Sequence, residues 1–423
     1  MIRFQKLGAL SLAALLSAST AFAAGFEKSQ TWSASAASQA SAVVGSVSGA
    51  DALYFNPAGL ASTSGTGDVS LNFSPTFSKF SGTNPLQTVS MDGKSGFSPV
   101  GALLASYRVT PQMVIGLGYY VSGGTKAKFE DINYTAGNSI VGAGVPGTAF
   151  TTEANLALTE AALGLGYEVM PGLRVGAAYR LLMVNADLQT VKFATTPTNL
   201  YAQVGVKDIS QTRPGFKFGA QYESQDKSWG VGADYRSQVS FNAEGDYTQT
   251  AYAAGTGSNL GTTTGKAHVA NTFPWQLAVG GFMQTGENLR TSLEYSYTNY
   301  NVDKELVITG PTATSAITQN WKNMHIARIG FDYSGMAMPI RFGYAYTSAV
   351  TPNDYPRSTF ASPGTGHAVV IGSGLNFGAI DFDYALEYSW ASGTGRNVQE
   401  AATTDSEFKS HAYVAHLSGK YHF

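Results

Sequence analysis

Serine and histidine are the residues of this sequence that could supply covalent chemistry. A hydrolase needs a nucleophile held within reach of a base. His416 lies on one face of the last predicted strand and is a candidate base, and serines are frequent on the corresponding faces of other strands. No sequence motif links a serine to His416, so we expect His416 to be structural. The sequence predicts no catalytic residue, no metal ion and no cofactor, and the absence of cysteine excludes thiol chemistry.

Arginine could bind a carboxylate, because its guanidinium group can form two parallel hydrogen bonds to that group. Arg180 is our candidate, since it lies in mid-strand between the apolar residues Ala178 and Leu182. The alternative for any single charge on this face is a structural ion pair. The charges predicted for the enclosed faces are Arg108, Arg174, Arg180, Lys217, Arg236, Arg290, Arg328, Arg341, Lys420, Glu223, Asp234, Glu294, Asp332, Asp381, Asp383 and Glu387.

Asn56, Pro57 and Ala58 lie in the stretch Ala-Leu-Tyr-Phe-Asn-Pro-Ala-Gly-Leu, which could fix a tight turn. Proline lacks an N–H and disfavours helical backbone at the preceding residue, while an asparagine side chain can bond nearby main chain. A Ser/Ala-rich segment precedes this stretch and a long series of strands follows it. We predict that residues 24–65 form a plug with Asn56-Pro57-Ala58 at its centre. An ordinary Asn-Pro turn leading into a strand is the alternative.

The composition favours membrane-spanning strands over membrane-spanning helices. Charged residues make up 13% of the chain, aromatic residues make up 12%, and 48 of the 423 residues are glycine. Soluble domains carry about 25% charged residues. No internal run approaches the roughly 18 apolar residues of a membrane helix, whereas a membrane strand needs only about 9–11 alternating residues. The net charge of −2 gives no reason to expect nucleic acid as a partner.

Short and long connections alternate along the chain from about residue 68 onward. The short ones are at residues 110–112, 170–172, 225–227, 286–288, 334–336 and 376–378. The long polar ones are at residues 82–96, 131–150, 195–204, 249–265, 309–318, 351–366 and 393–405. Short periplasmic turns alternating with long outer loops are typical of membrane barrels. The six short and seven long connections predict about fourteen strands.

The predicted strands carry apolar and aromatic residues on one face. Near residue 380, for example, Phe382, Leu386 and Trp390 alternate with Asp383 and Glu387. A soluble sandwich also alternates, but repeated aromatic residues near strand ends are typical of membrane interfaces. We therefore predict an all-β, transmembrane antiparallel barrel over residues 66–423. Tyr421 and the terminal Phe423 lie on its lipid face and resemble the signal that the barrel-assembly machinery reads during insertion.

Residues 1–23 have the pattern of a secretory signal peptide. Arg3 and Lys6 supply positive charge, residues 7–16 form a short apolar core, and Ala21-Phe22-Ala23 is a small-residue cleavage site. The mature chain would begin at Ala24-Gly25-Phe26. A signal peptide followed by a barrel predicts the outer membrane of a Gram-negative bacterium.

With these features the chain resembles the FadL family of outer-membrane transporters for hydrophobic compounds, which includes long-chain fatty-acid and toluene-uptake channels. The mature start, the context of Asn56-Pro57-Ala58, the strand count and the terminal Phe423 carry the resemblance. It implies no catalysis: a ligand enters among the outer loops, binds against the plug and leaves sideways into the membrane. Long-chain fatty acids are our first choice of substrate, and aromatic or aliphatic hydrocarbons remain open. The expected partners are hydrophobic small molecules, outer-membrane lipid and lipopolysaccharide, and we expect a monomer.

The resemblance also places a gap in the wall, at a kink in the third strand. Here the third predicted strand meets Ser122-Gly123-Gly124, and adjacent glycines favour a bulge. We expect Gly123 and Gly124 to mark the lateral opening; the alternative is that they begin the loop before Lys126. Phe26 and Arg180 are the residues that we expect to contact the ligand.

Two other protein classes deserve comparison with this pattern. A general diffusion porin shares the barrel, but the long segment before the first strand argues against an open channel. Aquaporins also contain Asn-Pro-Ala, but they need two copies between apolar helical spans, and this sequence has one copy and no such spans.

Overall fold

The computed structural model describes residues 32–83, 90–134, 144–194, 199–356, 363–396, 398 and 405–423. The predicted signal peptide and Phe26 lie outside the described residues.

No helix in the described part of the chain is both long enough and apolar enough to cross a membrane.

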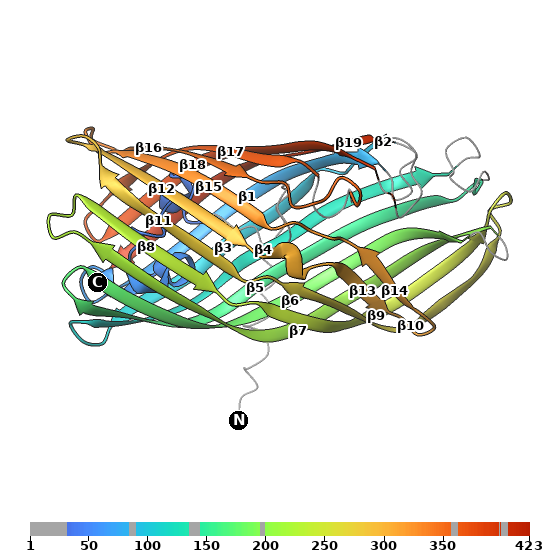
Figure 1. The fold of residues 1–423 in the computed structure, drawn as a ribbon, viewed down its shortest axis with the longest axis horizontal. Helices are drawn as coiled ribbons and strands as arrows, with labels where there is room; N and C mark the ends of the chain where they lie inside the picture. Colours follow the sequence, from blue (N-terminus) through green and yellow to red (C-terminus); the bar gives the residue numbers. More distant parts are fainter. Residues whose placement is uncertain are drawn as a thin grey trace, which may run out of the picture.

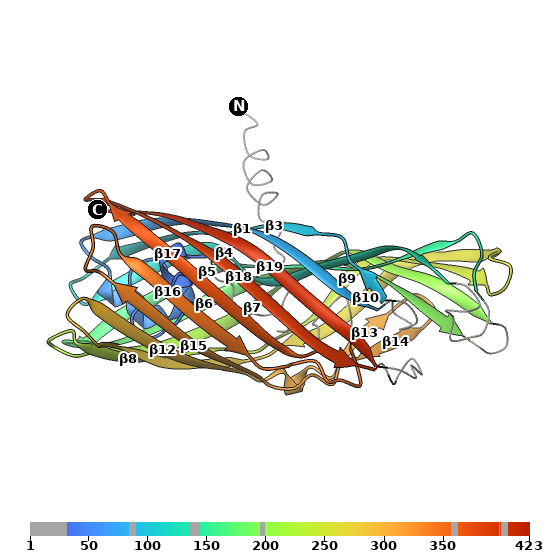
Figure 2. The same ribbon diagram turned by 90° about the horizontal axis from the view of Figure 1, so that it is seen from above.

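The described residues form a single antiparallel sheet that closes on itself as a barrel (Figures 1 and 2). Its strand segments are β1 (Gly67–Thr83), β2 (Ser90–Asp92), β3 (Gly96–Arg108), β4 (Met113–Asn133), β5 (Ala149–Met170), β6 (Leu173–Ala194), β7 (Leu200–Glu223), β8 (Trp229–Arg236), β9 (Val239–Ala253), β10 (Asn259–Phe273), β11 (Gln276–Gln284), β12 (Leu289–Thr298), β13 (Glu305–Thr309), β14 (Thr314–Thr318), β15 (Met324–Tyr333), β16 (Ile340–Thr347), β17 (Thr365–Asn376), β18 (Ile380–Gly395) and β19 (Ser406–His422). The first and last strands close the barrel, since β1 pairs with β19 from Asp68↔His422 to Ser81↔Lys409.

Fourteen wall strands account for these segments. Four long strands are each interrupted once, which divides them into β8 and β9, β10 and β11, β12 and β13, and β14 and β15. The short segment β2 extends the outer connection after β1 and is not a wall strand of its own. The prediction of an antiparallel barrel of about fourteen strands is therefore confirmed.

The short connections lie where the sequence predicts them, at one end of the barrel together with the C-terminus (Figure 1). Two of the predicted long loops are wrong, however. Residues 249–265 and 309–318 are mostly strand, and they form the outer parts of β9–β10 and β13–β14. These Thr- and Gly-rich stretches resemble loops because strands that stand in water carry polar side chains on their outer face.

The half of the barrel near the short turns has an apolar exterior. In β8, Trp229, Val231 and Tyr235 point outward and are exposed, while Asp234 and Arg236 point inward and are buried. Aromatic rings in contact mark the outer edge of this apolar band, as in Trp275–Tyr297 at 5.2 Å, His367–Trp390 at 5.3 Å and Tyr388–Tyr413 at 5.0 Å between ring centroids. Such girdles occur at the two surfaces of a membrane.

The half beyond this girdle has the opposite arrangement. In β9, Val239, Phe241 and Ala243 point inward and are buried, while Asn242 and Glu244 point outward and are exposed. The side that carries apolar residues switches at the interruption between β8 and β9, where residues 237 and 238 are not paired in the ladder. The outer half therefore stands in water and encloses an apolar interior.

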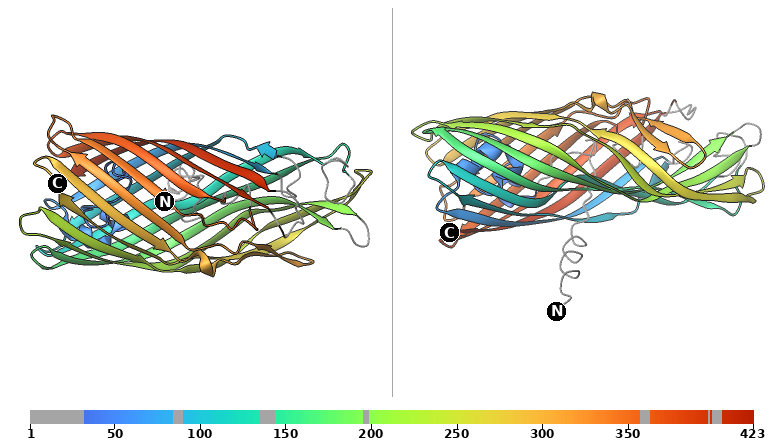
Figure 3. Two further views of the ribbon diagram at one scale, coloured as in Figure 1. Left: turned by 45° about the horizontal axis from the view of Figure 1, so that its top comes forward. Right: turned by 90° about the horizontal axis from the view of Figure 1, so that it is seen from below.

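Residues 32–63, which we call the inner segment, lie inside the barrel near the short turns (Figures 1 and 3). The segment contains the single-turn helices α2 (Ala34–Ala37) and α3 (Ala52–Phe55), and the 3-10 helix η1 (Pro57–Ser62). A further 3-10 turn, η3 (Tyr300–Val302), interrupts the wall between β12 and β13. Trp32, Leu53, Asn56 and Leu60 are fully buried, so the segment packs closely against the wall.

Candidate functional site

The inner segment approaches the wall closely because the wall offers glycine at the contact points. A Cβ added to any of these residues would crowd or overlap the inner segment. They are Gly116, Gly118, Gly164, Gly166, Gly176, Gly219, Gly232, Gly330, Gly343 and Gly372. Glycine allows such close backbone approach because it has no side chain. The abundance of glycine in the sequence thus serves the interior of the barrel as well as its turns.

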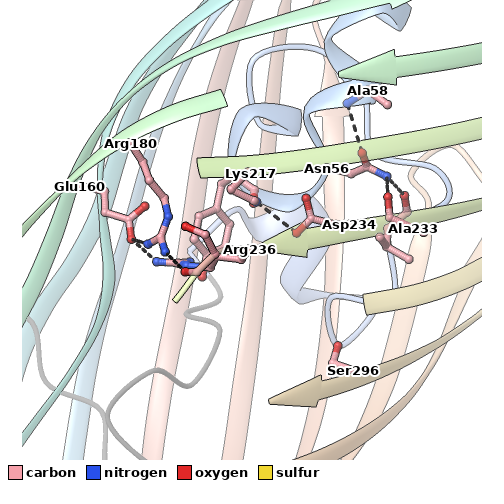
Figure 4. A network of polar contacts seen from close by, with 12 residues as sticks. Asn56, Ala58, Glu160, Arg180, Lys217, Ala233, Asp234, Arg236 and Ser296 are labelled. Atoms are coloured by element: carbon pink, nitrogen blue, oxygen red, sulfur yellow. Dashed lines mark hydrogen bonds and ion pairs between the residues drawn. The ribbon is translucent and has the colours of Figure 1, made fainter. Parts of the chain in front are cut away.

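Asn56 joins the inner segment to two wall strands (Figure 4). Its side-chain nitrogen donates to the carbonyl oxygens of Val44, Ala220 and Ala233 at 2.8, 3.1 and 3.2 Å. Its side-chain oxygen accepts a hydrogen bond from the backbone N–H of Ala58 at 3.1 Å. The extended backbone of Asn56 and Pro57 at the first position of η1 match the local expectation for this turn. The predicted motif residues Asn56, Pro57 and Ala58 therefore lie at the contact between inner segment and wall.

Charged wall residues also bind backbone groups of the inner segment. Glu294 accepts hydrogen bonds from the N–H groups of Val43 and Val44 at 3.0 and 2.9 Å. Lys217 donates to the carbonyl of Tyr54. These bonds satisfy main-chain groups of the inner segment, as the burial of that segment requires.

Most of the predicted interior charges pair with one another. Such pairs are Arg174–Glu223 at 2.7 Å, Lys217–Asp234 at 3.4 Å, Arg328–Glu294 at 2.9 Å, and Arg341 with Asp383 at 2.5 Å and Asp332 at 3.3 Å. Other residues of the set have partners outside it. For example, Arg108 donates to the carbonyl of Gly65, Arg290 lies over the ring of Phe282, and Lys420 pairs with Asp51 at 3.5 Å.

Arg180, our candidate for carboxylate binding, is fully buried in an ion-pair cluster (Figure 4). Its guanidinium donates to Glu160 at 2.8 Å and to the carbonyl of Ser237 at 2.5 Å. Arg236 binds the same oxygen of Glu160, and the Tyr120 hydroxyl donates to the other oxygen at 3.1 Å. Sequence reasoning missed Glu160, although its alternation with the outward Leu163 and Leu165 places it on the enclosed face.

A cavity of about 60 Å³ lies between the inner segment and the wall. This volume is enough for a few water molecules or one small polar head group. Its lining includes Tyr54 and Phe55 of the inner segment, the charged residues Lys217, Asp234, Arg236, Glu294 and Arg328, and the apolar residues Met324 and Ile326. Met324 and Ile326 also belong to the apolar interior of the outer half, which includes Leu158, Val206, Phe241 and Val269. The polar cavity therefore adjoins that apolar interior.

The cluster at this cavity combines positive and negative charges. The cations are Lys217, Arg236, Arg328 and Arg180, and the carboxylates are Asp234, Glu294 and Glu160. Glu160 pairs with both Arg180 and Arg236. The guanidinium groups of Arg236 and Arg328 line the cavity, and guanidinium groups are suited to bind a carboxylate.

The ladder between β3 and β4 is incomplete, and we call its unpaired stretch the gap. The two strands pair only from Ala102↔Tyr120 to Arg108↔Val114. Beyond this point β3 pairs with β1 and β4 pairs with β5, and no pair between residues 96–101 and 121–133 occurs among the described residues. At the outer end of this stretch, the N–H of Lys94, which precedes β3, donates to the carbonyl of Lys128 on β4 at 2.8 Å.

Gly123 and Gly124 lie at the inner end of this gap. A bulge at Ser122 shifts the β4–β5 register, because Val121 pairs with Thr159 and Gly123 with Leu158. Gly124 has a φ of 148°, a backbone conformation that residues with side chains rarely adopt. The two glycines do not begin a loop, since β4 continues to Asn133.

His416 contacts a serine and a carboxylate inside the barrel. Its Nδ1 is 2.8 Å from the Ser74 hydroxyl, its Nε2 is 3.4 Å from Glu387, and the same hydroxyl is 3.2 Å from the Trp32 carbonyl. All of these groups are buried, with the inner segment lying directly on Ser74. The arrangement ties three neighbouring strands to the inner segment, in agreement with a structural role for His416.

Tyr421 and Phe423 lie on the outer surface at the end with the short turns, 51% and 45% exposed. Their rings stack at 6.1 Å, and the carbonyl of Phe423 accepts hydrogen bonds from Thr66 and Gly67. The last residue is thus fixed to the start of β1.

Comparison with known proteins gives the chain a family. Residues 14–423 match the model of the outer membrane protein transport family (OMPP1/FadL/TodX). The chain belongs to this family. It is 23% identical over 239 residues to the outer membrane protein NMB0088 of Neisseria meningitidis serogroup B, a match that spans 49% of this chain and 50% of that protein.

Solved structures of similar fold agree with the barrel. A Pseudomonas aeruginosa FadL homologue superposes with a TM-score of 0.77 at 15% identity and covers 95% of this chain and 100% of its own. The toluene transporter TodX of P. putida gives a TM-score of 0.75 at 17% identity, covering 94% of this chain and 99% of its own. This member of the OMPP1/FadL/TodX family is therefore an outer-membrane β-barrel of a transport family.

Asp303 is a buried carboxyl group in the outer half. It lies beyond the end of β12, past the aromatic girdle, and is 2% exposed. Burial raises its pKa to about 8. An unfolded aspartate has a pKa of about 3.9, so between about pH 4 and 8 the folded protein holds a proton that the unfolded chain releases.

We therefore expect the free energy of unfolding to fall as pH rises from about 4 to about 8, and to level off above pH 8. The slope should correspond to the release of at most about one proton on unfolding. Asp303→Asn should remove this component. The unfolding temperature of the purified parent and of Asp303→Asn is measured between pH 4 and 9, with gel mobility as the readout of unfolding. Parallel curves for the two proteins would show that Asp303 does not hold this proton.

Proposed function

We propose that this protein takes up hydrophobic compounds across the outer membrane, with long-chain fatty acids as its substrates. The observation that carries the proposal is the reversal of the apolar face beyond the girdle. The outer half presents residues such as Glu244 to water and encloses residues such as Phe241 and Val269. An apolar interior in a water-exposed wall is suited to receive a hydrophobic molecule.

The cavity above the inner segment supports a carboxylate as the polar end of the substrate. Its lining carries Lys217, Arg236 and Arg328 beside the apolar residues Met324 and Ile326. A fatty acid could place its carboxylate among Lys217, Arg236 and Arg328 and its chain in the apolar interior. The solved relatives include a toluene transporter and a monoaromatic hydrocarbon channel, whose names point to uncharged substrates for those proteins.

Release would take place sideways through the gap between β3 and β4. The inner segment fills the barrel near the short turns, and we propose that it acts as a plug that blocks the direct path to the periplasm. A hydrocarbon chain gains about 0.8 kcal/mol per methylene on leaving water for lipid. Sideways release into the membrane therefore lowers the free energy of a hydrophobic substrate.

Binding of three probes to the purified protein tests the substrate class. We expect palmitate to bind about tenfold to hundredfold more tightly than hexadecanol, the range expected for hydrogen bonds to a charged group, and toluene to bind more weakly than either. Equal affinity of palmitate and hexadecanol would refute the carboxylate site and leave hydrophobic uptake intact. Mass spectrometry of lipid extracted from the protein would identify any amphiphile that copurifies.

A further inference from the structure

The side chain of Trp32 lies where the inner segment meets the wall gap. Its indole Nε1 donates a hydrogen bond to the backbone carbonyl of Val121 at 3.1 Å. Its ring contacts those of Tyr54, Phe55 and Tyr120, with centroids 5.0, 5.6 and 5.9 Å away. The residue is fully buried. One side chain of the inner segment thus contacts the strand that borders the gap.

Val121 is the first residue of β4 beyond the ladder with β3. The ladder ends at Ala102↔Tyr120, and the bulge at Ser122 follows immediately. A buried carbonyl requires a hydrogen-bond partner, and here the inner segment supplies it. The end of the gap is therefore held by a bond that lasts only while the inner segment remains in place.

Tyr120 extends this contact toward the cavity. Its ring packs on Trp32, and its hydroxyl donates to Glu160 at 3.1 Å. Glu160 in turn binds Arg236, which lines the cavity. An anion that competes for Arg236 would weaken the hold on Glu160, and this change would reach Tyr120 and Trp32 through direct contacts.

We propose that Trp32 is a positioning residue that couples the inner segment to the lateral gap. With Trp32 in place, its ring and its bond to Val121 separate the gap from the interior. When the inner segment moves, Trp32 withdraws and the inner end of the gap opens. This role rests on the proposed sideways release, and it assigns to one indole the link between ligand arrival and opening of the wall.

Cysteine labelling tests the coupling without requiring transport. The chain has no cysteine, so Ser122→Cys introduces a single thiol, at a residue that is 1% exposed beside the Trp32 contact. A membrane-soluble maleimide labels this thiol in the full-length protein reconstituted in lipid vesicles. Trp32→Phe keeps an aromatic ring and removes the donor, whereas Trp32→Ala removes both.

We expect Trp32→Phe to label about threefold to tenfold faster than the parent, the change expected for loss of one hydrogen bond, and Trp32→Ala to label faster still. Palmitate should accelerate labelling of the parent and add little in Trp32→Ala. Trp229→Phe is the matched control, because Trp229 is an exposed residue at the start of β8 and lies outside the contacts of Trp32 described above. Gel mobility of heated and unheated samples verifies that each barrel is folded.

Labelling of Trp32→Phe and Trp32→Ala at the parent rate would overturn the proposed coupling, even if palmitate uptake proceeds through the gap. Faster labelling would support it, even if uptake by the parent proved independent of the gap. The coupling and the proposed function can therefore fail separately.

Discussion

Replacing Gly123 and Gly124 together with valine should reduce uptake of a hydrophobic substrate to the background of cells that lack the protein. Valine strongly disfavours the positive φ of Gly124 and favours regular strand. The variant should therefore lose the bulge at Ser122 and extend the pairing of β4 toward β3. Uptake of labelled palmitate by whole cells measures the effect.

Gly419→Val is the matched control for this double variant. Gly419 lies on β19, and a Cβ added there meets no atom within 4 Å. This control should assemble and transport like the parent. Unchanged uptake in the Gly123→Val/Gly124→Val protein, with normal assembly, would show that substrate does not leave through this gap.

Replacing Gly219 with alanine should release the inner segment from the wall. The added Cβ would overlap the side-chain oxygen of Asn56, which is fully buried. Asn56 would then lose hydrogen bonds to Val44, Ala220 and Ala233. Of these bonds, only those to Ala220 and Ala233 join the inner segment to the wall. At about 1 kcal/mol for each bond, the loss of roughly 2 kcal/mol would raise the undocked fraction about thirtyfold.

Single-channel conductance measures the undocked fraction of Gly219→Ala. The parent should pass little steady current if the inner segment is a plug, and Gly219→Ala should show frequent openings. Gly205→Ala is the matched control on the same strand, because the nearest atom to its added Cβ is at 3.9 Å. A large steady current in the parent would favour a general diffusion porin, while silent Gly219→Ala channels would show that Asn56 does not hold the inner segment in place.

The sequence accounts well for the wall of this protein. The sequence shows local features such as the turn residues Pro171 and Gly172, and the alternation of Phe382 and Leu386 with Asp383 and Glu387. Each of these features can be recognised within a window of about ten residues. They were sufficient for the strand count, the closed antiparallel sheet and the aromatic outer face. The prediction erred at residues 249–265 and 309–318, where strands continue into water and the apolar residues point inward.

The interior contacts follow a different rule. Glu160 could have been placed on the enclosed face from its alternation with Leu163 and Leu165, but no local feature pairs it with Arg236, 76 positions away. No pattern singled out Trp32, whose partner Val121 is 89 positions away. Asn56 was recognised by its motif, but its acceptors on two wall strands were not.

Sequence alone thus determined the wall strands and, in the half near the short turns, the face that meets lipid, because the period of a strand and the chemistry of a turn are set by neighbouring residues. Tertiary structure decided which interior residues meet across the barrel. Those meetings depend on the register of strands far apart in the chain and on the depth at which the inner segment sits, and both are set only when the barrel closes around that segment.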